Sequence, residues 1–458
     1  MEVPAAGTDD TSVDKHTEPE AADVDSVEDL SVATEMKFLL RLTLPREPEA
    51  DRSRTEDERQ ALLQEQTRES VAATIRATGQ AAATVEAIKG DGLEERQVWA
   101  SHWIVKRANS ASPQEAEQAE QAALLSEDNS HYYYCYTWIP VELCSPRMRL
   151  RDPSTHERIA QALAALSAEH TLVANYTCEV HVHVGRMDGR PFALPTLQRL
   201  ATLLWLAEPT LRSIRDPASP NYHNVFTWGA ELRRQSRLAQ AVLTAGGGGG
   251  GGTPSSRRGR RTGDAQVDSI LASRPAEASP RDAQALELIW GAATHGELGR
   301  LLSGPGKQFR RLGFNFSAFG REDARARTNP RTVEFRIMEG TPRADLVLGW
   351  LAVCGAVAEA AALRSDERFR CAASRLLLLP PLADEDGGED EDGVRPGEGV
   401  EPMAAEEEGD RAWGVRSGGG RALAFRELMQ DLQVPRATYV AFEDKIAAQW
   451  AAAVAGPE

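Results

Sequence analysis

The chain has 458 residues, 41% of them hydrophobic, and a formal net charge of −17. This length suits one large domain or two ordinary ones, with a sizeable buried core. The charge is uneven, because residues 1–34 carry ten acids and one Lys and residues 384–410 carry thirteen acids and one Arg, which leaves about +4 for the rest. Such charge blocks are typical of solvated, disordered segments. The alternative is an acidic tail that binds a partner.

The cysteines and the N-terminal sequence indicate the cellular compartment in which the protein is expected. The five cysteines form no CxxC pair, so the sequence shows neither a disulfide framework nor zinc-finger spacing. Residues 1–34 lack the basic and apolar regions of a signal peptide, and no run of about 18 apolar residues indicates a membrane span. We therefore expect a cytoplasmic protein that does not bind a membrane.

The first half of the chain predicts strands and helices after a disordered leader at 1–32. Runs of β-branched and aromatic residues predict strands, and apolar spacings of three and four predict helices. Ser154 or Thr155 is expected to cap the second helix, and residues 113–125 to form an exposed helix or loop. Strands are expected at 36–44, 82–88, 97–105, 132–143 and 177–185, and helices at 56–77, 153–170 and 194–214.

A glycine run interrupts the second half. Gly246 to Gly252 has no side chains to bury, so residues 244–266 are predicted to be a flexible insertion. Four arginines follow it at once; they could contact nucleic acid, but a solvated loop is the preferred interpretation, and no nucleic-acid partner is expected. Further helices are expected at 282–302, at 347–363 and twice within 421–453, split near Pro435, and strands at 314–318 and 332–338.

The order of these elements indicates an α+β fold, because helices and strands are not linked as regular βαβ units. No internal repeat divides the chain. We predict one domain over residues 33–378, an acidic disordered linker over 379–415 and a C-terminal helical segment over 416–458.

One predicted strand carries two histidines. Because side chains alternate across a strand, Glu179, His181 and His183 are expected on one face, and Cys178 and the intervening valines on the other. Histidines two apart lie roughly 6–7 Å from each other along a strand. That spacing suits one metal, or one metal and a neighbouring anion. The alternative is a polar strand that faces solvent.

A second predicted strand combines a carboxylate with a guanidinium. Glu334, Arg336 and Met338 are expected on one face of the strand 332–338. The two charged residues could form an ordinary surface ion pair. They could also supply a hard oxygen ligand for Mg²⁺ and a bidentate contact to phosphate.

Two more acids stand at strand ends. Glu142 closes an aromatic strand just before Ser145, and Glu35 begins the first strand and shares a face with Lys37. Taken alone, each fits an ordinary solvated acid.

Together and in this order, these motifs resemble the family named putative amidoligase, a branch of the carboxylate–amine ligases with the glutamine synthetase fold. The resemblance spans roughly residues 33–365 and is carried by His181-Val-His183-Val-Gly185, Thr332-Val-Glu334-Phe-Arg336 and the Glu-Leu-Cys-Ser-Pro turn that starts at Glu142. It implies a glutamine-synthetase-like curved antiparallel sheet flanked by helices. It also implies ATP and Mg²⁺ or Mn²⁺ as cofactors, and carboxylate and amine substrates that are joined through an acyl phosphate.

The resemblance further implies roles for individual residues. Glu334 would hold a metal that bridges phosphates, and Arg336 would neutralise phosphate charge during the reaction. The implied metal ligands are Glu35, Glu142, His181 and Glu334, and the implied nucleotide contacts are His183, Arg336 and Arg215.

Two positions depart from the family pattern. The first strand commonly reads Glu-x-Glu, and here it reads Glu35-Met-Lys37. A protonated Lys cannot bind Mg²⁺, so Lys37, which we group with the catalytic residues, either takes the place of one cation or leaves a domain that only binds. The second departure is Lys106, just after the strand 97–105, at a position where the family pattern indicates substrate recognition. The alternatives are therefore a catalytically degenerate binding or scaffold protein and, from the His-x-His strand alone, a metal-dependent hydrolase.

Overall fold

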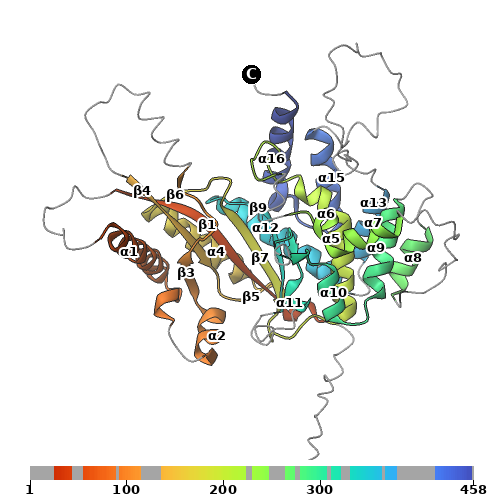
Figure 1. Cartoon of the computed structure of the whole chain (residues 1–458), viewed down its shortest axis with the longest axis horizontal. Coiled ribbons are helices and arrows are strands. Elements are labelled where there is room, and N and C mark those ends of the chain that lie inside the picture. The colour runs from red at the N-terminus through yellow and green to blue at the C-terminus, as the bar shows by residue number, and fades with distance from the viewer. Residues whose placement is uncertain are drawn as a thin grey trace, which may run out of the picture.

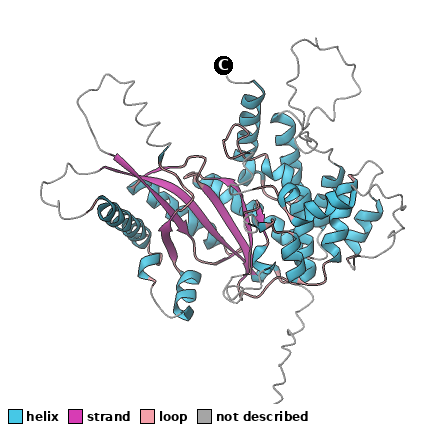
Figure 2. Cartoon of the chain, viewed as in Figure 1, coloured by secondary structure: helices cyan, strands magenta, loops and turns pink. Residues whose placement is uncertain are grey.

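The computed structural model has an α+β architecture, built on a nine-stranded open sheet. In Figure 2 the sheet occupies one half of the molecule, and most helices gather in the other half. The structure describes residues 25–43, 55–88, 92–114, 136–222, 230–246, 262, 264–273, 279–306, 311–320, 331–363, 367–378 and 418–455.

Most strand pairs in the sheet are antiparallel, as predicted, but one is parallel. The order along the sheet is β2-β3-β4-β1-β7-β9-β8, with β5 and β6 pairing to β1. β2 and β3 run parallel, so the predicted purely antiparallel sheet is wrong at this edge. The strands are β1 Leu30–Thr43, β2 Ala82–Thr84, β3 Trp103–Arg107, β4 Tyr136–Cys144, β5 Met148–Arg149, β6 Thr171–Val173, β7 Glu179–Arg186, β8 Phe314–Asn315 and β9 Val333–Glu339.

The parallel pair follows from a helical connection. Parallel neighbours need a crossover that returns the chain to the same end of the sheet. Here the crossover consists of the 3₁₀ turn η2 (Val85–Ala87) and the helix α2 (Gly92–Ser101). The predicted strand 97–105 is therefore wrong for residues 97–101, which are helical, and the predicted strand 82–88 ends at Thr84.

The long central strand β1 begins earlier than predicted. Residues 25–32, assigned to the disordered leader by sequence, form the turn η1 (Val27–Asp29) and the start of β1. Asp25 is buried, accepts a hydrogen bond from the backbone N of Ala193 at 2.8 Å and pairs with Arg186. These contacts attach the first described residues to the end of β7. Residues 1–24 lie outside the described part.

Alternate residues of β1 point into the main hydrophobic core, which includes α12 (Ala344–Ala362) and α4 (Pro153–Glu169). α12 packs on β7 and β1, and α1 (Glu56–Ala77) packs on β2 and β3 at one edge of the sheet (Figure 1). The opposite face of β1 is free to carry polar groups. The core-facing residues of β1 include Leu30, Val32, Met36, Phe38 and Leu40.

The predicted helices are found, with shifted ends. Asp152, not Ser154 or Thr155, caps α4: its side chain accepts from the backbone N of Ser154 at 2.9 Å, ahead of Pro153 in the first turn. The predicted helix 282–302 is two helices, α9 (Pro280–Gly291) and α10 (His295–Leu301), with Thr294 capping the second. The predicted strand 314–318 has only two strand residues and continues as α11 (Ser317–Gly320).

Among the remaining helices, the one predicted at 194–214 and the two predicted within 421–453 on either side of Pro435 are found, and the others were missed by sequence. The insertion predicted at 244–266 is narrower, because residues 244–246 and 265–266 are helical; residues 247–261 lie outside the described part, as do 115–125 of the predicted exposed segment and the linker 379–415. Besides α5 (Leu194–Arg212), these helices are α6 (Leu232–Gln235), α7 (Arg237–Gly246), α8 (Ala265–Ser273), α13 (Glu367–Leu378), α15 (Gly418–Asp431) and α16 (Arg436–Ala455).

Helix α6 begins on a buried carboxylate from α5. Glu208 accepts hydrogen bonds from the backbone N atoms of Leu232 and Arg233, both at 2.7 Å. Burial, with the charge of Glu231, raises the pKa of Glu208 to about 7. The folded protein therefore holds this proton more tightly than the unfolded chain does.

A pH dependence of stability follows from Glu208. Between the ordinary carboxyl pKa of 4.5 and about 7 the folded state binds more protons, so stability falls as the pH rises through this window. Relative to Glu208→Gln, the unfolding free energy of the wild type should fall by roughly 3 kcal/mol over the window. Denaturant titrations of both proteins across the pH range measure this difference. Parallel curves would contradict the assignment.

Helix α12 has the length and composition of a membrane span. Its mean hydropathy is 1.6, but 67% of it is buried inside the protein, which is the pattern of a core helix. One side of α12 is covered by α16: the ring of Trp350 meets that of Phe442 at a centroid distance of 6.4 Å. The C-terminal helices therefore share the main core with the sheet.

The contact between α12 and α16 depends on one glycine. A Cβ on Gly349 would lie 2.6 Å from the carbonyl oxygen of Thr438 and 3.0 Å from the Phe442 ring. Since a backbone oxygen cannot rotate away, Gly349→Ala should lower the unfolding free energy by about 1–3 kcal/mol. The matched control is Gly291→Ala, where the added methyl meets nothing within 4 Å; it should be neutral or slightly stabilising. Equal unfolding midpoints for the two variants would show that α16 does not pack there.

Candidate functional site

The face of the sheet opposite the main core carries a row of charged side chains. The strand register aligns them: Glu35 on β1 is opposite His181 on β7, and His183 on β7 is opposite Glu334 on β9. On the other side of β1, Lys37 is opposite Glu142 on β4. Because each side chain lies on the same face as its cross-strand partner, four strands bring their polar residues to one surface.

His181 lies between three carboxylates. Its Nδ1 is 3.1 Å from Glu334 Oε1 and 3.4 Å from Glu35 Oε2, and its Nε2 is 2.9 Å from Glu179 Oε2. His181 is 1% exposed. One carboxylate thus fixes the ring from its Nε2 side, while the other ring nitrogen points at a pair of carboxylate oxygens.

His183 points at the same two carboxylates. Its Nε2 lies 3.4 Å from Glu35 Oε1 and 3.7 Å from Glu334 Oε1. This nitrogen is buried and has no hydrogen-bond partner among the described residues. Its Nδ1 lies 3.0 Å from Thr332 Oγ1. Thr332 can approach because residue 185 is glycine, whose added Cβ would lie 2.8 Å from Thr332 Cγ2.

A β-bulge in β9 positions its charged residues. Val182 pairs with Phe335 but Val180 pairs with Met338, so Arg336 and Ile337 together oppose His181. The prediction that Met338 shares the face of Glu334 is therefore wrong: Met338 is in the main core. After the bulge it is Glu339 that lies opposite Glu179.

Glu334 and Arg336 form a buried ion pair on the charged face. Asn315 on β8 donates a second hydrogen bond to Glu334, from Nδ2 to Oε2 at 2.8 Å. Glu334 is 7% exposed and Arg336 5% exposed, so the pair is not the ordinary surface ion pair considered as an alternative from sequence.

Two lysines form ion pairs with the other carboxylates of the row. Lys37 Nζ lies 3.2 Å from Glu179 Oε2, and Lys106 Nζ lies 3.3 Å from Glu142 Oε1 and 3.9 Å from Glu35 Oε1. Lys37 and Glu179 are each 5% exposed. Lys37 therefore pairs with a carboxylate on β7 rather than with Glu35 on its own strand.

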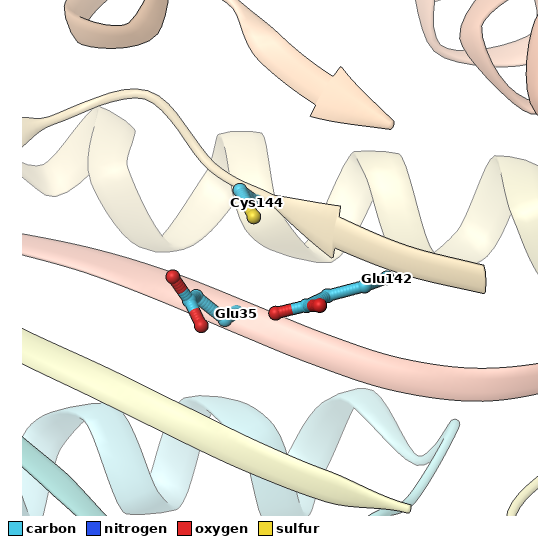
Figure 3. A group of neighbouring side chains, drawn as sticks. All are labelled: Glu35, Glu142 and Cys144. Carbon is cyan, nitrogen blue, oxygen red and sulfur yellow. The ribbon is translucent and has the colours of Figure 1, made fainter. Parts of the chain in front are cut away.

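Cys144 completes a second group of possible ligands. Figure 3 shows it on β4 with Glu142, both close to Glu35 on β1. Ser145 holds this end of β4 to β1, because its Oγ accepts from the backbone N of Thr34 at 2.8 Å and its own N donates to the Thr34 carbonyl. The Ser-Pro turn thus sets the position of Glu142 relative to Glu35.

Arg215 lies just beyond α5, at the end of the row. It is 2% exposed, and its Nη1 contacts the Ile337 carbonyl at 3.4 Å. Burial and the charge of Arg212 lower its pKa, although Glu339 and Glu179 attract its charge. It adds positive charge behind β9 rather than on the exposed part of the sheet face.

The charges of the row are strongly coupled. Burial acts to raise the pKa of Glu334, but the charge of Arg336 and the histidines outweigh it and hold that pKa well below its usual range. Burial also acts to raise the pKa of Glu35, and its ionic contacts with the two histidines reverse the effect. Burial and nearby cations lower the pKa of His181, but hydrogen bonds with Glu179 and Glu334 raise it, to about 9 on balance. Protons on the imidazoles thus balance these carboxylates.

Two overlapping ligand clusters share Glu35. Glu35, His183 and Glu334 offer ligand atoms within 4.8 Å of one another, and so do Glu35, Glu142 and Cys144. We call the first group, with His181, the histidine cluster and the second the thiol cluster. The orphaned Nε2 of His183 and the facing carboxylates fit a divalent ion, since an ion there would satisfy the nitrogen and replace the imidazole protons.

Several residues of this surface were not singled out by sequence. Lys106 was noted only as a departure, and Cys144 was not considered as a ligand. Asn315 could have been found from the alternation Phe-Asn-Phe at 314–316, which places its side chain on the face of the strand opposite to that of the two buried rings. Glu339 was predicted only as part of the Glu-Gly-Thr turn after the strand, because the bulge that places it opposite Glu179 is not visible in a strand's alternation. Cys178, predicted on the valine face, packs instead in a small cluster with Leu39 and Trp138.

Comparison with known proteins adds a family assignment. Residues 51–239 match the family model described as "Putative amidoligase enzyme". The match is narrower than the motif resemblance. It contains Glu142, His181 and His183, but not Glu35 or Glu334, which join the site because β1 and β9 pair with β7. No curated protein and no solved structure matched the chain. Over residues 51–239, this protein is similar to the putative amidoligase family.

Proposed function

We propose that this protein is an ATP- and divalent-metal-dependent amidoligase that joins a carboxylate to an amine through an acyl phosphate. The observation that carries the proposal is the convergence of Glu35, His181, His183 and Glu334 from three strands on one buried point. We further propose that the sheet corresponds to the curved antiparallel sheet of the glutamine synthetase fold.

The histidine cluster would hold the metal ion. Each imidazole already has a partner on its far nitrogen, Glu179 for His181 and Thr332 for His183. Such partners fix the tautomer and orientation of a ligating ring. Two carboxylates complete the set, and oxygen-rich sites suit Mg²⁺ or Mn²⁺. ATP would supply the phosphoryl group, and an ion held by this cluster would offset its charge.

The cations of the row would manage the charge of the substrates. Arg336 is held in place by Glu334 and is a fixed guanidinium beside the cluster, suited to a negatively charged phosphoryl group. Arg215 would act at longer range, since it is buried behind β9. Lys37 would keep Glu179 oriented toward His181, because Glu179 Oε2 contacts both side chains.

The test of this proposal is ADP formation across a panel of amino acids and amines in the presence of Mg²⁺ or Mn²⁺. ADP formation that requires both a carboxylate and an amine, and a product that contains the new amide, is the expected result. ADP formation with water as the only acceptor would contradict a ligase.

A binding protein without catalysis is the second candidate, and the lysines favour it. Lys37 and Lys106 both occupy carboxylates that could otherwise bind ions. Thermal unfolding with Mg²⁺ and ATP separates the two candidates, because a ligand at a hundred times its Kd stabilises the fold by roughly 2.7 kcal/mol. No shift would favour the binding protein. A shift with metal alone, unaffected by nucleotide, would favour a metal-dependent hydrolase.

A further inference from the structure

The thiol cluster already contains a cation. Lys106 Nζ lies 3.3 Å from Glu142 Oε1 and 3.9 Å from Glu35 Oε1. These are two of the three residues whose ligand atoms gather within 4.8 Å of one another. The ammonium group therefore stands where an ion bound by this cluster would have to be.

The strand register fixes Lys106 in this position. Lys106 on β3 is directly opposite Glu142 on β4, and Ile104 is opposite Cys144. The side chain thus starts on the charged face. Its Nζ lies 5.6 Å from the centre of the Trp99 ring, a contact on its other side that holds a cation favourably. These contacts hold the Lys106 side chain in place on the charged face, so it is not a solvated lysine.

The cations around the histidine cluster are arranged differently. Arg336 pairs with Glu334 at one end of the cluster, and His183 Nε2 remains buried without a hydrogen bond among the described residues. The two clusters share Glu35, but Lys106 Nζ lies closer to Glu142 of the thiol cluster, at 3.3 Å, than to the shared Glu35, at 3.9 Å. The clusters therefore differ in whether a divalent ion can enter.

The charge of the row also favours a single ion. Four carboxylates face three fixed cations, so the row carries one net negative charge when its imidazoles are neutral. One divalent ion would make it +1, which suits an anionic substrate, and a second would make it +3 in a buried setting. The carboxylates are Glu35, Glu142, Glu179 and Glu334, and the cations are Lys37, Lys106 and Arg336.

We propose that the site binds one divalent ion, in the histidine cluster, and that the ammonium of Lys106 permanently takes the place of a second ion in the thiol cluster. A divalent ion and an ammonium a few ångströms apart repel strongly in a buried site, so the two occupants exclude each other. This inference rests on the proposed function, since it assumes that the histidine cluster binds a metal.

The test counts Mn²⁺ bound per chain, from the electron paramagnetic resonance signal of free Mn²⁺ during titration of the full chain. The wild type should bind one ion and Lys106→Met two, because Met removes the charge and leaves Glu35, Glu142 and Cys144 in place. The double variant Lys106→Met/Glu142→Gln should return to one, which locates the second ion. Arg107→Met, an equal loss of charge at the exposed neighbouring position, should bind one.

The outcomes separate this inference from the proposed function. Two ions in the wild type, or one ion in a folded Lys106→Met, would overturn the role of Lys106 and leave the ligase proposal standing. Two ions in Arg107→Met would also overturn it, because net charge rather than position would then control binding. No ion in the wild type would overturn the metal site itself. The wild-type count decides even if a variant fails to fold.

Discussion

Replacing Glu334 with Gln should lower ADP formation by about 10²–10³-fold, because a side chain that stabilises the transferred charge through the ion contributes on this scale. The amide keeps the shape of the side chain and its hydrogen bond to Asn315, but it removes the negative charge that faces both histidines. Steady-state ADP release with saturating Mn²⁺ measures the effect. The loss should appear in kcat rather than only in the apparent affinity for metal.

The control for this variant is Glu359→Gln. Glu359 also pairs with arginines, Arg151 and Arg368, but it lies on α12, away from the charged face. It should retain wild-type turnover. Comparable losses in both variants would indicate a general effect on folding, and wild-type turnover in Glu334→Gln would exclude Glu334 from the reaction.

Replacing Arg336 with Met should lower the unfolding free energy of the metal-free protein by about 3–5 kcal/mol, because it removes the guanidinium that pairs with the buried carboxylate of Glu334. In saturating Mn²⁺ the loss should be smaller, since the ion supplies positive charge to the same carboxylate. Denaturant unfolding in chelator and in Mn²⁺ measures both values.

The matched control is Arg151→Met. Arg151 pairs with Glu359 and Glu28, but its side chain is 41% exposed, so its removal should cost less than about 1 kcal/mol. A loss for Arg336→Met that is the same with and without Mn²⁺ would show that no ion binds near Glu334. A loss as small as that of the control would show that the pair is solvated.

Alternation along strands was enough to predict much of the site surface. It placed Glu179, His181 and His183 on one face, and the register of β1 with β7 brings them to Glu35. It also placed Lys37 beside Glu35 on β1. These predictions succeed because a residue's face depends only on its own strand, and the valines of β7 leave one choice for the buried side.

The parts that failed depend on pairing between distant segments. The bulge at Arg336 and Ile337 appears only when β9 is laid against β7, and it moves Met338 into the core and Glu339 to the charged face. The helix α2 was mistaken for part of a strand because Val98 and Trp99 fit either element. Short apolar runs do not distinguish the two without their neighbours.

Lys106 shows a different kind of limit. In the sequence it stood out only as a departure from the family pattern, at a position tied to substrate recognition. Only the antiparallel pairing of β3 with β4 places its ammonium against Glu142 and Glu35. A cation tethered between carboxylates of two other strands has no local signature, because each of the three residues lies in an ordinary alternating strand.

The most direct test of the central claim is the anomalous difference map of crystals grown with Mn²⁺. The account predicts a peak bounded by Glu35, His181, His183 and Glu334, at about 2.0–2.2 Å from the ligating atoms if the ion coordinates as Mg²⁺ and Zn²⁺ do. A map without a peak there, in which the imidazoles remain hydrogen-bonded to these carboxylates, would contradict it.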